Sequence, residues 1–357
     1  MSAETSLWLN TNTLIGMTAN RGTAWHYRKE DQGEESNHYE GAIPVGDVER
    51  RLFYWDAVKV PVLAEFPADI ETMTGFITDG LPVRQQEIPG LVAIARSDND
   101  HVFKIFTDGY EIHQYREWLL NTVSTILGDT LVITSAGLLK QGGQAWVEVS
   151  VPETLHDAET GFAFRPNLLA ATSLDGSLST TYTRTVTATV CDNTMAAALL
   201  EGRDQRVKIK HSRYSGLRID EARESLSLIE QTADAFTDAL HELTRTTVTD
   251  KQWFSFVDQW QKDQRNGKEI PEKGRGKAIA ERERDELNRM YFNDVRANTW
   301  KGTAFGVVQA VNTWAHHEAT VKGATRSERN AEGAITGKFD ALDRAALATL
   351  DKILANA

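Results

Sequence analysis

The hydrophobic pattern of this 357-residue chain changes its period partway along, and this change limits the folds open to it. Up to about residue 190, short runs rich in β-branched and aromatic residues are separated by turn residues, which is typical of strands. Beyond residue 219 the apolar residues recur at steps of three and four, as in Ala222, Leu226, Ile229, Ala233, Phe236 and Leu240. The sequence therefore predicts an α+β fold with a helical C-terminal part.

The strand-like runs and one helix between them predict a definite order of elements. A helical period within 110–127 interrupts the runs, and Gly128 ends it. The capping cluster Asp192-Asn193-Thr194 predicts a further helix that begins at Met195. We predict a mostly antiparallel sheet in the order β-β-β-α-β-β-β-β-α, with strands in 57–63, 91–96, 101–106, 131–135, 144–151, 168–173 and 180–190. The expected units are an N-terminal arm at 1–42, an α+β sheet domain at 43–218 and a helical domain at 219–357, which carries a basic loop near 262–284.

Cysteine usage and charge exclude several classes of protein. Cys191 is the only cysteine, which excludes an intramolecular disulfide and a thiolate metal centre built from one chain. No apolar run is long enough for a membrane span and the first residues lack a signal-peptide pattern, so we expect no membrane association and a location in the cytoplasm of a host cell. The formal net charge of −12 disfavours attraction of nucleic acid to the whole surface but allows a local basic strip.

A basic stretch after the last predicted strand is the best candidate for a binding site. It holds six fixed positive charges against one aspartate. Apolar and basic residues alternate, so a strand here would place Arg206, Lys208 and Lys210 along one face, where they could meet a phosphate backbone. The alternative is a solvated edge strand whose charges prevent aggregation. The residues assigned to nucleic-acid binding, including a tyrosine that could stack on a base, are Arg203, Arg206, Lys208, Lys210, His211, Arg213, Tyr214 and Arg218.

A second basic segment, 262–284, lies within the helical half. Its Gly-Arg-Gly-Lys phrase is typical of a flexible loop that conforms to phosphates, and we add Lys273, Arg275 and Lys277 to the predicted site. Five acidic residues in the segment dilute its charge. The aromatic residues just before it, Trp253, Phe254, Phe256 and Trp260, are expected to dock this helix onto the first domain.

The sequence contains no recognisable catalytic or metal-binding motif. Adjacent His316 and His317 would diverge by about 100° on a helix and could not face one ion. Ser173 and Asp175 lack the surroundings of a hydrolase nucleophile, and Asp175-Gly176 fits a hairpin turn. There is no phosphate-binding loop of the nucleotide-hydrolysing type. We therefore assign no catalytic residue, no metal and no cofactor, and expect a binding protein rather than an enzyme.

An ordered series of phrases in the chain resembles one known family. The phrases include Gly22-Thr23-Ala24-Trp25-His26, Arg96-Ser97-Asp98, Asp108-Gly109-Tyr110, Ser135-Ala136-Gly137-Leu138-Leu139, Gly143-Gln144-Ala145-Trp146-Val147, Pro166-Asn167-Leu168-Leu169, Val190-Cys191-Asp192-Asn193-Thr194 and Gly302-Thr303-Ala304. Together they resemble the phage/plasmid-like proteins of the domain of unknown function 932 family. The resemblance implies a mobile-element context without an agreed activity. Leu174 departs from it, because a histidine is expected there in a Ser-His-Asp-Gly phrase.

The residues and the resemblance together predict a phage- or plasmid-type nucleic-acid-binding protein. The β-β-β-α order is similar to the core of single-strand annealing proteins from phage recombination systems, so we expect single-stranded DNA binding or annealing in recombination or replication. We also expect a homo-oligomer. The alternative, motivated by the net charge of −12, is a non-catalytic interaction factor that binds a host protein through an acidic surface.

Overall fold

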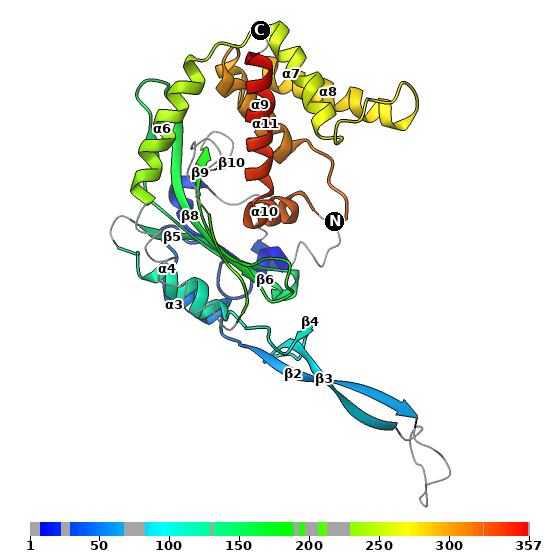
Figure 1. Ribbon diagram of the computed structural model, residues 1–357. Helices are drawn as coiled ribbons and strands as arrows, with labels where there is room; N and C mark the ends of the chain where they lie inside the picture. Colours follow the sequence, from blue (N-terminus) through cyan, green and yellow to red (C-terminus); the bar gives the residue numbers. More distant parts are fainter. Residues whose placement is uncertain are drawn as a thin grey trace, which may run out of the picture.

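The computed structural model describes residues 8–22, 29–67, 83–128, 131–188, 193–196, 206–212, 229–323 and 325–355. Antiparallel sheets occupy the N-terminal half and helices fill the C-terminal part, which confirms the predicted α+β class (Figure 1). In these ranges the strands form an eight-stranded main sheet and a three-stranded sheet that extends from it as an arm.

The main sheet is antiparallel throughout its described pairs. Its strands are β1 (Thr13–Ile15), β5 (Val132–Leu139), β6 (Gln144–Ser150), β7 (Leu155–His156), β8 (Ala163–Ser173), β9 (Thr180–Ala188), β10 (Asn193–Ala196) and β11 (Arg206–Ile209). The hydrogen-bonded order is β1-β5-β6-β8-β9-β10, with β7 beside β8 and β11 beside β9. β1 comes from the segment predicted as an N-terminal arm, and its pairing with β5 makes this part of the segment an edge strand of the sheet.

One local prediction in this sheet is wrong. The helix predicted to begin at Met195 is a strand over Asn193–Ala196, and this strand pairs with β9. The free edge of β9 offers backbone hydrogen-bond partners to the whole segment, which outweighs a local capping signal. The remainder of the predicted helix, 197–200, lies outside the described residues, as does Cys191.

The three-stranded sheet is a long arm built on a hairpin. Its strands are β2 (Ala57–Pro67), β3 (Val83–Arg96) and β4 (Val102–Thr107), in that order. Figure 1 shows β2 and β3 running away from the body as a twisted ribbon. The predicted hairpin turn between β3 and β4 is present, with the Arg96 amide donating to the His101 carbonyl at 2.9 Å. Where the arm joins the main sheet, Ile94 is fully buried in the hydrophobic core between that sheet and the short helices, which we call the main core.

Short helices cover one face of the main sheet. They are α3 (Val45–Arg51), the π-helical segment η3 (Arg116–Asn121) and α4 (Thr122–Ser124). Leu52, Trp118 and Leu119 from these helices and their flanks pack against Val147 and Leu168 of the sheet, and all five are buried. Shorter helical turns lie elsewhere in the chain, at α2 (Thr18–Arg21), η1 (Lys29–Asp31), η4 (Lys140–Gly142) and η7 (Asn298–Trp300).

The C-terminal helices form a core of their own. They are α6 (Ile229–Arg245), α7 (Asp250–Asp263), α8 (Arg275–Asn293), α9 (Ala304–His317), α10 (Arg326–Thr336) and α11 (Lys338–Ala355). Trp253, Phe256 and Trp260 of α7 lie inside this core, and Trp253 stacks on Tyr291 of α8 with ring centroids 4.0 Å apart. The expectation that these aromatic residues dock α7 onto the sheet domain is therefore wrong. Their apolar partners come from α8, α9 and α11, which offer a matching helical face.

Several contacts join the helical half to the main sheet. Phe236 of α6 packs on Phe164 of β8. On the face opposite α3, Ile335 of α10 packs with Trp146 and Leu169. The described helices include none that is both long and apolar enough to cross a membrane.

Candidate functional site

The register of the main sheet decides which residues share the face covered by α10, which we call the α10 face. Directly paired residues of neighbouring antiparallel strands lie on the same side of a sheet. One row of paired residues on this face consists of Thr13, Gly137, Trp146, Ala171, Thr181 and Lys208. The adjacent row consists of Ile15, Ser135, Glu148, Leu169 and Thr183. The basic strand β11 and the centre of the sheet therefore share one face.

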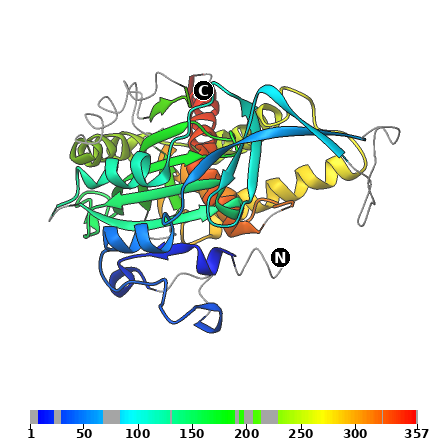
Figure 2. The ribbon, with the colours of Figure 1, turned by 90° about the horizontal axis from the view of Figure 1, so that it is seen from below.

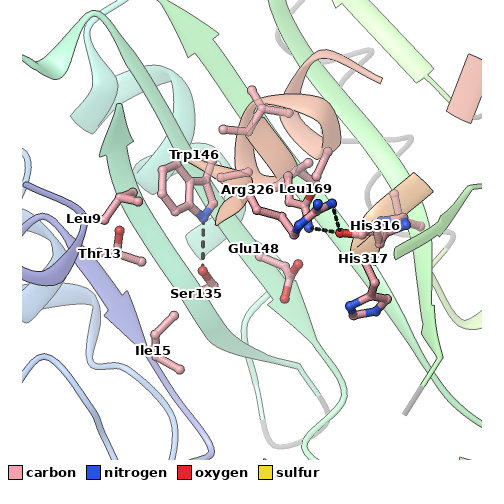
Figure 3. A pocket seen from close by; sticks show the side chains of 15 residues that line it. Leu9, Thr13, Ile15, Ser135, Trp146, Glu148, Leu169, His316, His317 and Arg326 are labelled. Carbon is pink, nitrogen blue, oxygen red and sulfur yellow. Dashed lines mark hydrogen bonds between the residues drawn. The ribbon is translucent and has the colours of Figure 1, made fainter. Parts of the chain in front are cut away.

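A cavity of about 410 Å³ lies between the α10 face and the helices above it (Figure 3). Its sheet side includes Trp146 and Glu148, and its helical side includes Arg326 of α10 and His317 at the end of α9. The volume lies in the range of small-molecule sites, which is roughly 300–1,000 Å³. Glu148, His317 and Arg326 are each partly exposed, so the cavity reaches solvent on their side.

Apolar side chains make most of the cavity wall. They are Leu9, Ile15, Leu169, Ala331, Ala334 and Ile335. Trp146 adds an aromatic ring, whose orientation is fixed because its indole nitrogen donates to Ser135 Oγ at 3.0 Å. A mostly apolar wall with a few fixed polar groups is the usual composition of a ligand site.

The polar groups of the cavity are only partly satisfied. The Oε1 atom of Glu148 accepts a hydrogen bond from Thr134 at 2.9 Å. On the helical side, Arg326 and Asn330 both donate to the His316 carbonyl, at 3.3 and 3.1 Å, and so cap the C-terminal end of α9. The hydroxyl oxygens of Thr13 and Thr185 are buried without a hydrogen-bond partner among the described atoms. Such groups are rare in folded proteins and often indicate a missing water or ligand.

The basic strand has the alternation that the sequence predicted. Lys208 and Lys210 are exposed, whereas Ile209 between them is 1% exposed and belongs to the main core. Arg206 is the first residue of β11 and pairs with Thr183 through its backbone. Other predicted members of this site, Arg203, Arg213, Tyr214 and Arg218, lie outside the described residues.

The structure separates His211 from the exposed lysines. Its ring enters a continuous stack of five rings under the opposite face of the sheet, in the order Phe106, Tyr110, His211, His113 and Trp118, with neighbouring centroids 3.9, 5.0, 4.0 and 3.7 Å apart. His211 Nε2 lies 3.1 Å from Thr172 Oγ1, and this hydroxyl lies 2.7 Å from Thr180 Oγ1, the partner of His113 Nδ1. Two imidazoles therefore join one buried hydrogen-bonded chain.

Burial keeps both imidazoles of this stack neutral. It lowers the pKa of His113 to about 3, with a further decrease from neighbouring His211, and it lowers the pKa of His211 to about 4. Neutral rings are the favoured form because a buried charge without a counter-ion is costly. At neutral pH, His211 therefore brings no positive charge to the predicted site.

The second predicted basic segment lies apart from β11. Lys273, Arg275 and Lys277 are exposed on the loop between α7 and α8 and on the first turn of α8. Figures 1 and 2 show this loop at the outer end of the α7–α8 pair, away from the main sheet. Lys277 forms an ion pair with Glu281 at 3.6 Å. The structure thus does not bring the two basic segments together.

The histidine pair at the end of α9 does not form a metal site. His316 is buried, stacks on Phe339 and bonds to the Asn312 carbonyl at 2.9 Å, and burial lowers its pKa to about 3. Both His316 and His317 line the cavity. No cluster of three or more metal-ligating side chains occurs in the part of the chain that the structure describes.

The cavity is the feature that sequence reasoning missed. Its polar groups come from separate segments, with Glu148 on β6, Thr185 on β9 and Arg326 on α10. A partial signal was present, because Trp146 falls in a phrase that carries the family resemblance and His317 had been considered as a ligand.

Comparison with known proteins finds a match to a family model. A family model described as Domain of unknown function (DUF932) matches residues 102–336, a segment that runs from β4 to α10 and includes β11. No curated protein and no solved structure matches the chain.

Proposed function

The chain belongs to the DUF932 family, and we propose that it binds single-stranded nucleic acid through β11. The observation that carries this proposal is the alternation on β11, where Lys208 and Lys210 are exposed and Ile209 is held in the core. A strand anchored in this way fixes the spacing of its cations. Cations in a fixed row suit a phosphate backbone.

A single strand is a better match than a duplex for this surface. The formal net charge of −12 means that a rigid duplex would bring many phosphates against an acidic protein. A flexible single strand can follow a short basic strip and expose its bases to neighbouring aromatic groups. We place the activity in recombination or replication of a phage or plasmid, inside the host cell, as strand binding or annealing by a homo-oligomer. Arg203, Arg206, Arg213, Tyr214 and Arg218 extend the proposed contact surface, and Lys273, Arg275 and Lys277 form a second, separate one.

A salt series tests the proposal directly. Fluorescence anisotropy of a labelled thirty-nucleotide dT strand and of a duplex is measured with the purified protein at several salt concentrations. We expect tighter binding of the single strand, with affinity that falls steeply as salt rises. Each phosphate contact to a single strand contributes about 0.7 to the slope of log affinity against log salt, so Lys208→Ala/Lys210→Ala should reduce the slope by about 1.4.

A matched control removes two exposed lysines elsewhere. Lys251 and Lys322 are exposed and lie away from β11 in the sequence, so Lys251→Ala/Lys322→Ala changes the net charge equally. The control should keep the wild-type slope. Equal slopes for both double variants would reject β11 as the contact surface. No strand binding at low salt would favour the alternative, a factor that binds a host protein through its acidic surface.

A further inference from the structure

We propose that the cavity between the α10 face and α10 is a nucleobase site that prefers guanine. The base would come from the strand bound at β11 or from a free nucleotide. The first source rests on the proposed function, and the second does not. The argument uses the shape of the cavity, its unsatisfied hydroxyls and the placement of two opposite charges.

The walls of the cavity suit a flat ring with a polar edge. The sheet supplies Ile15, Leu169 and the fixed ring of Trp146 on one side, and α10 supplies Ala331 and other small or apolar residues on the other. A ring between a sheet and a helix would be enclosed on both faces by apolar groups. Planar aromatic ligands gain most from such enclosure, because both of their faces leave water.

Two buried hydroxyls indicate that the ligand also offers hydrogen bonds. Thr13 is 4% exposed and Thr185 is 5% exposed, both line the cavity, and the Oγ1 atom of each has no partner among the described atoms. An unsatisfied buried polar group costs about 1–3 kcal/mol. A purely aliphatic ligand would leave this cost in place, whereas a heteroaromatic base can remove it.

The charged groups favour guanine among the bases. Glu148 lies on the sheet side and Arg326 on the helical side, and no ion pair joins them among the described contacts. A carboxylate accepts hydrogen bonds from the adjacent N–H groups of guanine N1 and N2. A guanidinium donates to guanine O6 and N7, the commonest specific contact of arginine with a base. Guanine has both edges, whereas thymine has no amino group, adenine has no carbonyl, and cytosine has neither a ring N–H beside its amino group nor an N7.

The position of the cavity connects it to the basic strand. Trp146 and Lys208 belong to the same row of the α10 face, three strand spacings apart, which is roughly 14 Å at about 4.8 Å per spacing. A short length of single strand held by the β11 lysines can therefore reach the cavity with one base.

Calorimetric titration with the four deoxynucleoside monophosphates tests the cavity without a strand. We expect dGMP to bind at one site per chain and more tightly than dAMP, dCMP or dTMP. Glu148→Gln removes the charge at nearly constant shape and should weaken dGMP binding at least about fivefold, the lower end expected for loss of a bidentate base contact. Ala334→Trp fills the cavity from α10 and should abolish dGMP binding. The control Lys251→Ala/Lys322→Ala should bind dGMP like the wild type.

The folded state of each variant is checked by circular dichroism and thermal unfolding, and Ala334→Trp keeps the test valid if Glu148→Gln is unstable. Absence of dGMP binding, equal binding of all four nucleotides, or wild-type affinity in both cavity variants would overturn the proposal.

A strand experiment then separates the two sources of the base. A dT strand with one central dG is compared with all-dT. Tighter binding of the dG strand by the wild type, lost in Ala334→Trp, supports a base taken from the bound strand. Binding of dGMP without this gain supports a free nucleotide. The protein could bind the dT strand through Lys208 and Lys210 but neither bind dGMP nor bind the dG strand more tightly. This outcome would reject the cavity proposal and leave the proposed function standing. Binding of dGMP without binding of any strand would support the cavity proposal and reject the proposed function.

Discussion

At the scale of single residues, Trp146 holds its place in the cavity wall because residue 137 is a glycine. A Cβ atom on Gly137 would lie 2.2 Å from Cη2 of the Trp146 ring. The two residues are paired across β5 and β6, so neither backbone can move without breaking the ladder. The ring therefore lies directly over the glycine, and its nitrogen reaches Ser135.

Gly137→Ala is expected to displace the Trp146 ring and lower the free energy of unfolding by about 1–3 kcal/mol, the usual cost of overpacking a core. Urea denaturation followed by circular dichroism measures the change. Gly46→Ala is the control, because nothing lies within 4 Å of a Cβ at Gly46, and it should leave stability unchanged or raise it by up to about 1 kcal/mol. Wild-type stability in Gly137→Ala would show that the ring is free to move.

The buried histidines make stability depend on pH. The pKa of His113 is about 3 in the folded chain, and an exposed histidine has a pKa near 6.5. Between these values the unfolded chain binds more protons than the folded chain. The stability gained by burying neutral His113 is therefore fully present above pH 6.5, and it decreases as the pH falls toward 3. His113 alone should account for about 2.7 kcal/mol of lost stability by pH 4.5, at about 1.36 kcal/mol for each pH unit below 6.5.

His113→Phe tests this pH dependence, because phenylalanine keeps a ring beside Trp118 and does not titrate. Urea denaturation at several pH values from 7 to 4.5 should give a flatter decrease for the variant than for the wild type. The comparison is needed because other groups add a decrease in the same direction. The pKa of Asp157, for example, is lowered by hydrogen bonds from Thr160 and His241 against the opposing effect of burial. Parallel curves of stability against pH for the two proteins would show that His113 does not cause the decrease.

At the scale of elements, a buried polar pair fixes how α9 crosses α11. Asn312 Nδ2 donates to both carboxylate oxygens of Asp343, at 3.1 and 3.2 Å, and both residues are fully buried. Asn312→Leu should lower the free energy of unfolding by about 1–3 kcal/mol, because it leaves a buried carboxylate short of donors. Thermal unfolding measures the change. Asn312→Leu combined with Asp343→Leu should recover part of the loss, and no recovery would argue against direct coupling of the pair.

The strand and helix patterns could be predicted from sequence where one face of an element is buried. Lys208, Ile209 and Lys210 show why, because the period of two is imposed by a single core on one side of β11. Met195 shows the limit: the capping signal before it predicts a helix, but the residues pair with β9, the preceding strand. The docking partner of α7 was missed because helical spacing predicts an apolar face and not what covers it.

The cavity could not be predicted because no local pattern encodes it. Thr13 and Arg326 lie at opposite ends of the chain and meet only after β1 has joined the sheet and α10 has packed over it. Both residues have an ordinary local explanation, since threonine is common in strands and arginine is a good helix former. Only the assembled fold shows that two hydroxyls have been left without partners.

At the scale of the whole molecule, the arm leaves an apolar sheet face uncovered. The paired rows Val58–Ala95–Val102 and Val60–Ala93–Ile105 share one face of the three-stranded sheet. Val58, Val102 and Ile105 are 37%, 51% and 50% exposed, whereas Ile94 on the opposite face is fully buried in the core. Clustered apolar side chains on an exposed sheet indicate a binding surface. A second copy of the chain can cover this face symmetrically, since the same patch serves on both partners of a twofold dimer.

The homo-oligomer that we propose should therefore depend on this face. Val102→Lys/Ile105→Lys is expected to shift the protein from a self-associated species to the monomer, because lysine cannot be buried in an apolar contact without losing its hydration. Analytical ultracentrifugation over a concentration series measures the shift. Val295→Lys is the matched control: Val295 is 77% exposed and lies outside both sheets, so its replacement should leave association unchanged. A wild-type protein that stays monomeric at every concentration, or a double variant that associates like the wild type, would exclude this face as the contact.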